Sequence, residues 1–350
     1  MEDVMHRNQL FIANTWRDPT SDERITVVSP HTEAMVGSAP EASVHDIDLA
    51  VAAARRAVDT GPWARSLPAE RVAVVRKLAD LYGERRRDFA QLITAEMGAP
   101  ISFSKLAQAT LPWSMLHAFA GLAEAHPWEE TRPGFYGGDV QIRREPVGVV
   151  AAIIPWNMPQ FLMVSKLAPA LLAGCAVVIK PAAETPLDAL VLGDLIEQLD
   201  LPPGVVSIVP GGRATGEHLV GHAGVDKVSF TGSTAAGRSV AARCGQDLKR
   251  MSLELGGKSA AVVLDDADPV RVAQGIKTAG LMNSGQACVA QTRILVPKAR
   301  REEHLEALAS MIDGLVVGDP MDRATEIGPL VAQRQRNGFG GSSPAPWPTG

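Results

Sequence analysis

The chain has 350 residues, of which 46% are apolar and 21% are charged, and its formal net charge is -5. A chain of this length and apolar content can bury a large core and form more than one domain. No basic stripe interleaved with aromatic residues is present, which argues against nucleic acid as a partner. We therefore expect a globular protein that binds a neutral or polar small molecule.

The N-terminal residues 1–19 lack the basic start and apolar run of a signal peptide, and the longest apolar segments are too short to span a bilayer. We expect a cytoplasmic protein with no membrane partner. The three cysteines, Cys175, Cys244 and Cys288, show no CxxC spacing, so they predict neither a zinc site nor a disulfide framework. Free thiols and no metal site are expected.

Two segments in the first hundred residues have the periodicity of amphipathic helices. Residues 46–59 carry apolar side chains at helical spacing. Residues 68–98 do so over many turns and begin with Pro68 at a suitable first helical position. We interpret both segments as scaffold helices.

From residue 126 onward, strand patterns appear and then alternate with helices. A Gly-Gly turn within residues 126–146 predicts a hairpin. Four short apolar strands follow, each before a helical segment, at 148–155, 176–181, 204–211 and 226–233. This alternation is typical of an α/β fold with a doubly wound parallel sheet, as in Rossmann-like cofactor domains.

A second alternation begins after paired glycines. Gly256 and Gly257 break two apolar segments and indicate a domain boundary. We predict one α/β domain over residues 1–255 and a second α/β domain over residues 256–336. The Gly/Ser/Pro-rich residues 337–350 have no helical periodicity and form a separate tail.

Polar residues at the carboxyl ends of the predicted strands are candidate ligand contacts, because open α/β sheets bind ligands there. Gly232 and Ser233 offer a close backbone approach and a helix N-cap that suits a phosphate, although an ordinary capping turn explains them equally well. Glu184, after Lys180, suits ribose hydroxyls or a surface ion pair. The G-x-G-x-x-G fingerprint is absent, and residues 211–216 only approximate it.

Three further residues suit covalent chemistry. Asn157 follows an apolar strand between two prolines, so its amide could stabilise an oxyanion or belong to an ordinary turn. Glu254 ends an apolar strand, where a carboxylate is costly to ionise and suits a general base, with a structural salt bridge as the alternative. Cys288 lies among small and polar residues, which favours a reachable thiol, whereas Cys175 and Cys244 are interpreted as structural.

These segments together resemble the aldehyde dehydrogenase family. The resemblance is carried by IIPWNMPQF, KPAAETP, FTGSTAAGR, LELGGKSA and NSGQACVAQTR, in this order, and it extends from about residue 8 to residue 335. Glu254 and Cys288, 34 residues apart (288 − 254), lie in its two specific motifs. The resemblance implies that Cys288 attacks an aldehyde to give a thiohemiacetal. It also implies that Asn157 and the Cys288 N–H hold the oxyanion and that Glu254 activates water to hydrolyse the thioester.

The resemblance also implies a dinucleotide cofactor and an oligomer. Glu184 favours NAD because a carboxylate repels the additional phosphate of NADP, although NADP is not excluded. The hairpin at 126–146 resembles the oligomerisation element of homo-oligomeric relatives, and the helix over 101–124, with Trp113 and Met115, would line an aldehyde tunnel. The implied cofactor contacts are Ile153, Pro155, Trp156, Lys180, Glu184, Gly216, Phe230, Gly232, Ser233, Gly237, Leu255 and Gln335.

The C-terminal end departs from the family pattern. Members continue past this length with another ribose-binding glutamate and a last strand, so we interpret the chain as C-terminally truncated. The resemblance implies that residues 1–255 form the dinucleotide-binding domain and that residues 256–336 form an incomplete catalytic domain. One codon choice from Arg336 onward, read two bases later, encodes an amphipathic helix, which suggests a frameshift. The predicted function is oxidation of an aldehyde to a carboxylic acid. The alternatives are an inactive fragment that at most binds dinucleotide, and a cofactor-independent thiol esterase.

Overall fold

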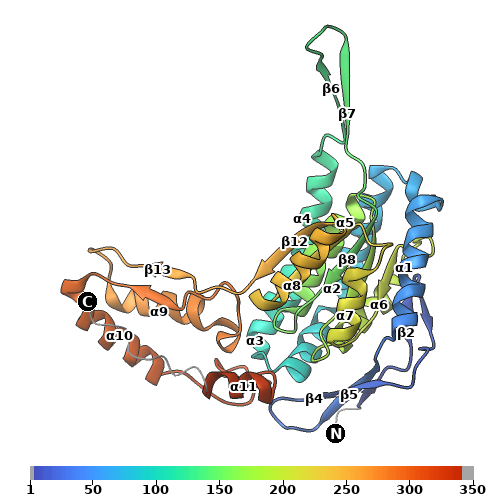
Figure 1. The fold of residues 1–350 in the computed structure, drawn as a ribbon. Helices are drawn as coiled ribbons and strands as arrows, with labels where there is room; N and C mark the ends of the chain where they lie inside the picture. Colours follow the sequence, from blue (N-terminus) through green and yellow to red (C-terminus); the bar gives the residue numbers. More distant parts are fainter. Residues whose placement is uncertain (1–3, 341–350) are drawn as a thin grey trace.

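A seven-stranded sheet forms the centre of the computed structural model, which describes residues 4–340 (Figure 1). Five of its strands are parallel, in the order β12-β11-β8-β9-β10. Along the chain, β8 is the first of these strands, and β9 and β10 are added on one side of it. The chain then crosses back, and β11 and β12 are added on the other side of β8, as predicted for a doubly wound sheet. The bounds are β8 (Val149–Ile153), β9 (Ala176–Lys180), β10 (Val206–Ile208), β11 (Lys227–Gly232) and β12 (Arg250–Leu255).

Helices cover both faces of this sheet. On one face, α5 and α6 connect β8 to β10, and α2 and α4 pack on them. On the other face, α7 and α8 connect β10 to β12 beside α1. Strands β8, β9 and β10 are buried along their whole length, as expected for a parallel sheet covered on both sides. The helices are α1 (Val44–Asp59), α2 (Pro68–Met97), α4 (Leu111–Ala125), α5 (Pro159–Leu172), α6 (Leu187–Ile196), α7 (Arg213–Gly221) and α8 (Thr234–Gln246).

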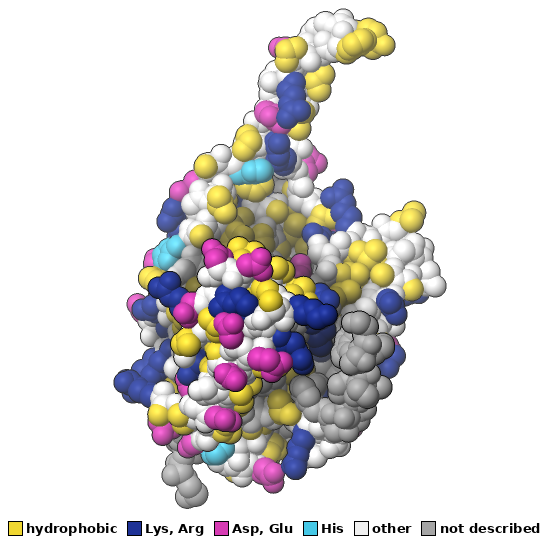
Figure 2. Space-filling model, turned by 90° about the vertical axis from the view of Figure 1, so that its left-hand side faces the viewer, with side chains coloured by type: hydrophobic (Ala, Val, Ile, Leu, Met, Phe, Trp, Pro, Cys, Tyr) yellow, Lys and Arg dark blue, Asp and Glu magenta, His cyan; other side chains and the backbone are white. Residues whose placement is uncertain are grey.

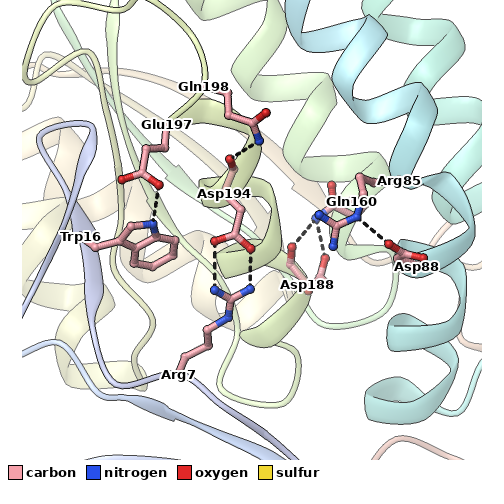
Figure 3. A network of polar contacts seen from close by, with 9 residues as sticks. All are labelled: Arg7, Trp16, Arg85, Asp88, Gln160, Asp188, Asp194, Glu197 and Gln198. Atoms are coloured by element: carbon pink, nitrogen blue, oxygen red, sulfur yellow. Dashed lines mark hydrogen bonds and ion pairs between the residues drawn. The ribbon is translucent and has the colours of Figure 1, made fainter. Parts of the chain in front are cut away.

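The N-terminal segment forms strands that the sequence pattern did not indicate. β2 (Leu10–Ile12) and β3 (Thr15–Arg17) extend the large sheet past β10 in antiparallel pairing. A separate three-stranded sheet contains β1 (Met5–His6), β4 (Arg24–Val28) and β5 (Met35–Pro40). Side chains tie this segment to α6, because Arg7 donates to Asp194 (2.9 and 2.5 Å) and Trp16 Nε1 donates to Glu197 (3.2 Å; Figure 3).

After β12 the chain leaves the large sheet at the exposed Gly256 and Gly257, where the domain boundary is predicted, and forms a smaller unit. Its two strands pair in parallel, and its helices α9 and α10 pack around Ala273, Ile276 and Met311. In Figure 1 this smaller unit extends away from the large sheet. Its elements are β13 (Ala260–Val262), α9 (Pro269–Leu281), the 3-10 turn η3 (Met282–Gly285), β14 (Arg293–Leu295), η4 (Lys298–Arg300) and α10 (Arg301–Asp313).

The predicted hairpin is present as β6 (Glu129–Pro133) and β7 (Asp139–Arg143). It projects from the end of α4, and Figure 2 shows hydrophobic surface at its tip. Phe135 and Tyr136 there are 93% and 97% exposed. Its role in oligomerisation stays a prediction. Among the described helices, none is long and apolar enough to cross a membrane.

Two helical predictions need correction. The helix expected over 101–124 is interrupted, because α3 (Ile101–Phe103) passes into a π-helix, η2 (Ser104–Thr110), before α4 begins. The tail predicted to lack helix is helical through residue 340, in α11 (Gln333–Gly340). The Gln333 amide donates to Asn337 Oδ1 across one turn (2.9 Å), which supports that extension. The rest of the predicted tail lies outside the described residues.

Candidate active site

The carboxyl ends of four neighbouring strands align several of the predicted cofactor residues. The register pairs Ile153 of β8 with Lys180 of β9 on one side and with Phe230 of β11 on the other. One position further along, Glu254 of β12 pairs with Thr231. The winding direction reverses between β8 and β11, and open α/β sheets bind ligands at such a reversal.

The turn after β11 is shaped by glycines. A Cβ added at Gly232 would lie 2.5 Å from Phe230 Cζ, and one added at Gly237 would lie 2.5 Å from Leu255 Cδ2. Ser233 caps α8 by accepting a hydrogen bond from the Ala236 N–H (3.2 Å). Because a capped helix start still has further N–H groups without intrahelical acceptors, this turn suits a phosphate group.

Lys180 lies at the opposite side of β8 and is 7% exposed. Its ammonium donates to the carbonyls of Pro181 (2.9 Å) and Gly211 (2.6 Å). Burial lowers the pKa of Lys180 to about 8, and the charge of Glu41 partly offsets that effect. A Cβ added at Gly216 would lie 3.5 Å from Lys180 Cδ, so these two predicted contacts lie together.

Glu184 forms an ion pair with Arg334 of α11, which was the alternative interpretation of this carboxylate. The Glu184 side chain is 16% exposed and that of Arg334 is 63% exposed. A pocket of about 780 Å³ lies between the turn that contains Glu184, strand β4 and residues 329–336. Gln335, the last predicted cofactor contact, is half-buried in the same helix as Arg334.

Asn157 joins the large sheet to the loop that carries Cys288. Its Nδ2 donates to the Gln286 carbonyl (2.9 Å), two residues before the cysteine. Its Oδ1 accepts from the Met158 N–H (3.0 Å), which fixes the orientation of the amide. An asparagine amide has two N–H donors, so the contact with Gln286 leaves one for a ligand. The structure thus brings together the predicted oxyanion donor and the loop of the predicted nucleophile.

The backbone before Cys288 is held in a left-handed conformation. Asn283, Ser284 and Gly285 have φ values of 56°, 57° and 76° in succession. Positive φ values are unfavourable for residues that have a Cβ, such as Asn283 and Ser284. The backbone conformation therefore depends on contacts from outside the loop. Asn283 Nδ2 donates to the Asn157 carbonyl (2.9 Å), and Ser284 Oγ accepts from the Gly328 N–H (2.9 Å).

Gln286 and Trp156 connect this loop region to the last described segment. Gln286 Oε1 accepts from the Val331 N–H (3.0 Å), and its Nε2 donates to the Pro329 carbonyl (3.4 Å). Trp156 packs against a small buried cluster that contains Val331 and Met97. Trp156 therefore has a packing role next to the site, and Gln286 positions a backbone rather than a substrate.

The three thiols differ in burial in the way the sequence predicted. Cys288 is half-buried, whereas Cys175 is 3% exposed and Cys244 is 0% exposed. Burial raises the pKa of both the Cys175 and the Cys244 thiols, which disfavours their thiolates. Among the cysteines, only Cys288 combines access with the contacts of the site.

Glu254 requires a correction, because it is exposed rather than enclosed by apolar side chains. The reason is that β12 is an edge strand with one neighbour.

Lys166 of α5, which nothing in the sequence pattern singled out, is 8% exposed and donates to Ser229 Oγ (3.2 Å). Burial lowers the pKa of Lys166 to about 8, whereas the charge of Glu254 raises it and that of Lys227 lowers it. The sequence feature that could have identified Lys166 is its position as a charged residue in the largely apolar segment 159–172.

The interrupted helix contributes Gln108 to the site, and it packs Trp113 against α2. Gln108 is fully buried, and its Nε2 donates to the Asn157 carbonyl (3.0 Å). The Trp113 ring faces α2, where the Arg86 guanidinium lies 4.3 Å from the ring centroid and Gly83 approaches the indole nitrogen. Trp113 therefore packs between α2 and α4, and the roles of Trp113 and Met115 in lining a tunnel stay predictions.

Comparison with known proteins decides the family. Residues 16–341 match the model of the aldehyde dehydrogenase family. The chain belongs to that family. It is 44% identical to geranial dehydrogenase of Castellaniella defragrans, over 95% of this chain and 70% of that protein. It is 37% identical to phenylacetaldehyde dehydrogenase of Pseudomonas fluorescens, over 93% of this chain and 66% of that protein.

Solved aldehyde dehydrogenases share the fold. The Mycobacterium tuberculosis aldehyde dehydrogenase complexed with NAD+ superposes with a TM-score of 0.93 at 44% identity, over 96% of this chain and 69% of that one. A Pseudomonas syringae aldehyde dehydrogenase C mutant, complexed with NAD+ and octanal, gives 0.90 at 36% identity, over 95% and 69%. The chain thus spans about two thirds of the length of these relatives, between 66% and 70%.

Proposed function

We propose that this aldehyde dehydrogenase oxidises an aldehyde to a carboxylic acid with NAD as the hydride acceptor and Cys288 as the nucleophile. The observation that carries the proposal is the hydrogen bond from the Asn157 amide to the Gln286 carbonyl (2.9 Å). This bond holds an oxyanion donor beside the loop of the half-buried Cys288. The NAD+ complexes of the M. tuberculosis and P. syringae enzymes support the choice of cofactor.

In the first step the Cys288 thiolate attacks the carbonyl carbon of the aldehyde. A C–S bond forms, and the electron pair of the C=O π bond moves to the oxygen. The second N–H of Asn157 and the backbone N–H of Cys288 stabilise that oxyanion. One such donor is worth about 3 kcal/mol of transition-state stabilisation, because it is positioned before the charge develops.

The strand-end residues fit a dinucleotide. Gly232, Ser233 and the start of α8 would hold the phosphates, while Ile153, Pro155 and Trp156 would lie along the cofactor. Lys180 and Glu184 would contact the ribose hydroxyls once Arg334 gives way, and the freed carboxylate of Glu184 would favour NAD over NADP. When bound, the nicotinamide supplies the acceptor for the hydride that leaves the thiohemiacetal carbon, which becomes a thioester.

Hydrolysis of the thioester completes the reaction. Glu254 takes a proton from water, the water oxygen adds to the thioester carbon, and the C–S bond breaks to release the acid and the Cys288 thiolate. The exposure of Glu254 gives it direct access to water. The charge of Glu254 partly offsets the burial that lowers the pKa of Lys166, so the proposed base and this lysine lie close enough to interact.

The test is NADH formation by the purified chain with phenylacetaldehyde, octanal and geranial, the aldehydes named for its relatives. Cys288→Ser is expected to lower turnover by at least about a thousandfold. Cys244→Ser, a change at a buried thiol outside the site, is the matched control. The absence of NADH above the Cys288→Ser background would contradict the proposal. Ester hydrolysis without NAD, lost in the same variant, would favour the thiol esterase.

A further inference from the structure

We propose that Gln108 is a positioning residue for the oxyanion donor Asn157 and that the π-helix η2 sets its register. The proposal rests on the proposed function, because it assigns Gln108 a role in the reactivity of Cys288. Gln108 lies outside every motif that marks the site in the sequence, and it reaches the site through a single hydrogen bond to the Asn157 carbonyl (3.0 Å).

The Asn157–Met158 peptide group transmits the effect of Gln108 to the reacting amide. At one end of this peptide, the Asn157 carbonyl accepts from Gln108 Nε2 (3.0 Å) and Asn283 Nδ2 (2.9 Å). At the other end, the Met158 N–H donates to Asn157 Oδ1 (3.0 Å). A peptide group is planar and stiff, so donors that hold its oxygen also fix the direction of its N–H. Gln108 and Asn283 therefore fix the orientation of the Asn157 amide.

The π-helix determines where the Gln108 side chain lies. One π-helical turn rotates the side chains that follow relative to an uninterrupted α-helix, and such turns are frequent at functional sites. Three contacts hold η2 in this form: Thr94 Oγ1 donates to Ser104 Oγ (2.8 Å), the Tyr82 hydroxyl donates to the Gln108 carbonyl (3.2 Å), and Thr110 Oγ1 donates to the Lys105 carbonyl (2.8 Å). The register of Gln108 is thus fixed from α2 and from η2 itself.

The contribution of Gln108 to folding should be separable from its effect on the site. Its side chain is fully buried, yet Oε1 has no hydrogen-bond partner among the described residues. A buried acceptor without a partner costs free energy, which opposes the gain from the bond made by Nε2. Methionine has a similar length and removes both the donor and the unpaired acceptor. Gln108→Met is therefore expected to fold with nearly unchanged stability.

The first experiment measures ester hydrolysis by Cys288 without NAD, so that cofactor binding does not enter. We expect Gln108→Met to lower kcat about tenfold with KM within about twofold, a smaller loss than the hundredfold or more for removal of an oxyanion donor. Leu106→Ala, a change to a 60% exposed side chain on the same π-helix, is the control and should leave kcat unchanged. In an Asn157→Ala background, Gln108→Met should have almost no further effect, because it acts through that amide.

Equal losses from Gln108→Met in the presence and absence of Asn157 would overturn the inference, since they indicate an effect that bypasses the amide. If Asn157→Ala alone leaves kcat unchanged, the oxyanion role in the proposed function fails instead. Hydrogen exchange of residues 154–158 and 283–288 decides the matter if the chain shows no ester turnover. Gln108→Met should speed exchange in both segments and Leu106→Ala in neither, and unchanged exchange in Gln108→Met would reject the inference.

Discussion

The large sheet and the smaller unit that follows it are built from the same alternation of strands and helices, but only the central strands of the large sheet are enclosed. Its strands β8, β9 and β10 are buried throughout. In the smaller unit, Val262 of β13 is 69% exposed and Leu295 of β14 is 51% exposed. Equal local patterns therefore lead to unequal burial, because burial depends on how many elements pack on each strand.

The smaller unit takes part of its order from contacts with the larger one. The Ile101 N–H donates to the Pro320 carbonyl (2.8 Å), and Asn157 Nδ2 donates to the Gln286 carbonyl (2.9 Å). The left-handed backbone at Asn283 and Ser284 lies at this junction. The candidate active site is thus located where the two regions meet, and its geometry requires both.

A matched pair of core truncations tests the comparison most strongly. Ile179 of β9 is 0% exposed, and Ile276 of α9 is 7% exposed. We expect Ile179→Ala to lower the free energy of unfolding by about 2–5 kcal/mol and Ile276→Ala by about 1–2 kcal/mol, because the neighbours of Ile276 are half-exposed and can close over the cavity. Urea unfolding followed by circular dichroism measures both values. Equal losses would show that the two cores are packed alike.

A buried pair of acids in the larger region predicts a pH-dependent stability. Glu96 accepts from the Leu187 and Asp188 N–H groups (both 3.1 Å), and Gln160 Nε2 donates to Asp188 Oδ2 (2.7 Å; Figure 3). Burial raises the pKa of Asp188 to about 7, and burial followed by the charge of Asp188 raises that of Glu96.

Since the folded state retains the Asp188 proton while the unfolded state loses it, the stability from this group falls as pH rises from 3.8 to about 7. Asp188→Asn removes the titration and should flatten the pH profile by on the order of 2 kcal/mol. Urea unfolding at pH values across this window measures the difference. A profile as steep as that of the wild type would contradict the assignment.

Loss of Gln286 should loosen the junction without unfolding either region. Gln286→Ala removes the contacts with the Val331 N–H (3.0 Å) and the Pro329 carbonyl (3.4 Å). We expect a loss of about 1 kcal/mol for a buried hydrogen-bonding side chain and faster hydrogen exchange at 283–288 and 329–332. Residues 176–180 of β9 serve as the internal control and should stay protected. Equal acceleration in β9 would mean that the two regions unfold together.

Arg334→Ala should have the smallest effect. Arg334 pairs with Glu184 from an exposed position, with 63% of its side chain accessible. Exposed ion pairs contribute at most about 1 kcal/mol, so the stability should change by less than that and the change should shrink in high salt. Thermal unfolding at two salt concentrations measures it. A larger loss would mean that α11 helps to hold the smaller unit in place.

The sequence was sufficient for most of the larger region. The apolar strands and their helices occur where the periodicity places them, because an enclosed parallel sheet requires continuous apolar runs. The N-terminal strands β2 and β3 were not foreseen, because strands of three residues are too short to show periodicity. The π-helix η2 was also not foreseen, because its apolar spacing fits an ordinary helix equally well.

Some residues of the candidate site could be selected from the sequence, but their arrangement could not. Asn157 and Cys288 could be chosen from their strand-end and loop surroundings, and Cys175 and Cys244 could be set aside. The exposure of Glu254 could not be foreseen, because it follows from the place of β12 at the edge of the sheet. Gln108 and Lys166 carry no motif, so only their neighbours in space connect them with the site.

By itself, the sequence determined which segments form the parallel sheet and predicted which residues carry the chemistry, since both depend on residue type and on spacing along the chain. The tertiary structure decided which groups meet: the Asn157 amide and the Gln286 carbonyl, Gln108 and the same asparagine, Arg334 and Glu184. These contacts join segments that are far apart in the chain. Their partners follow from strand order and packing, which local patterns do not contain.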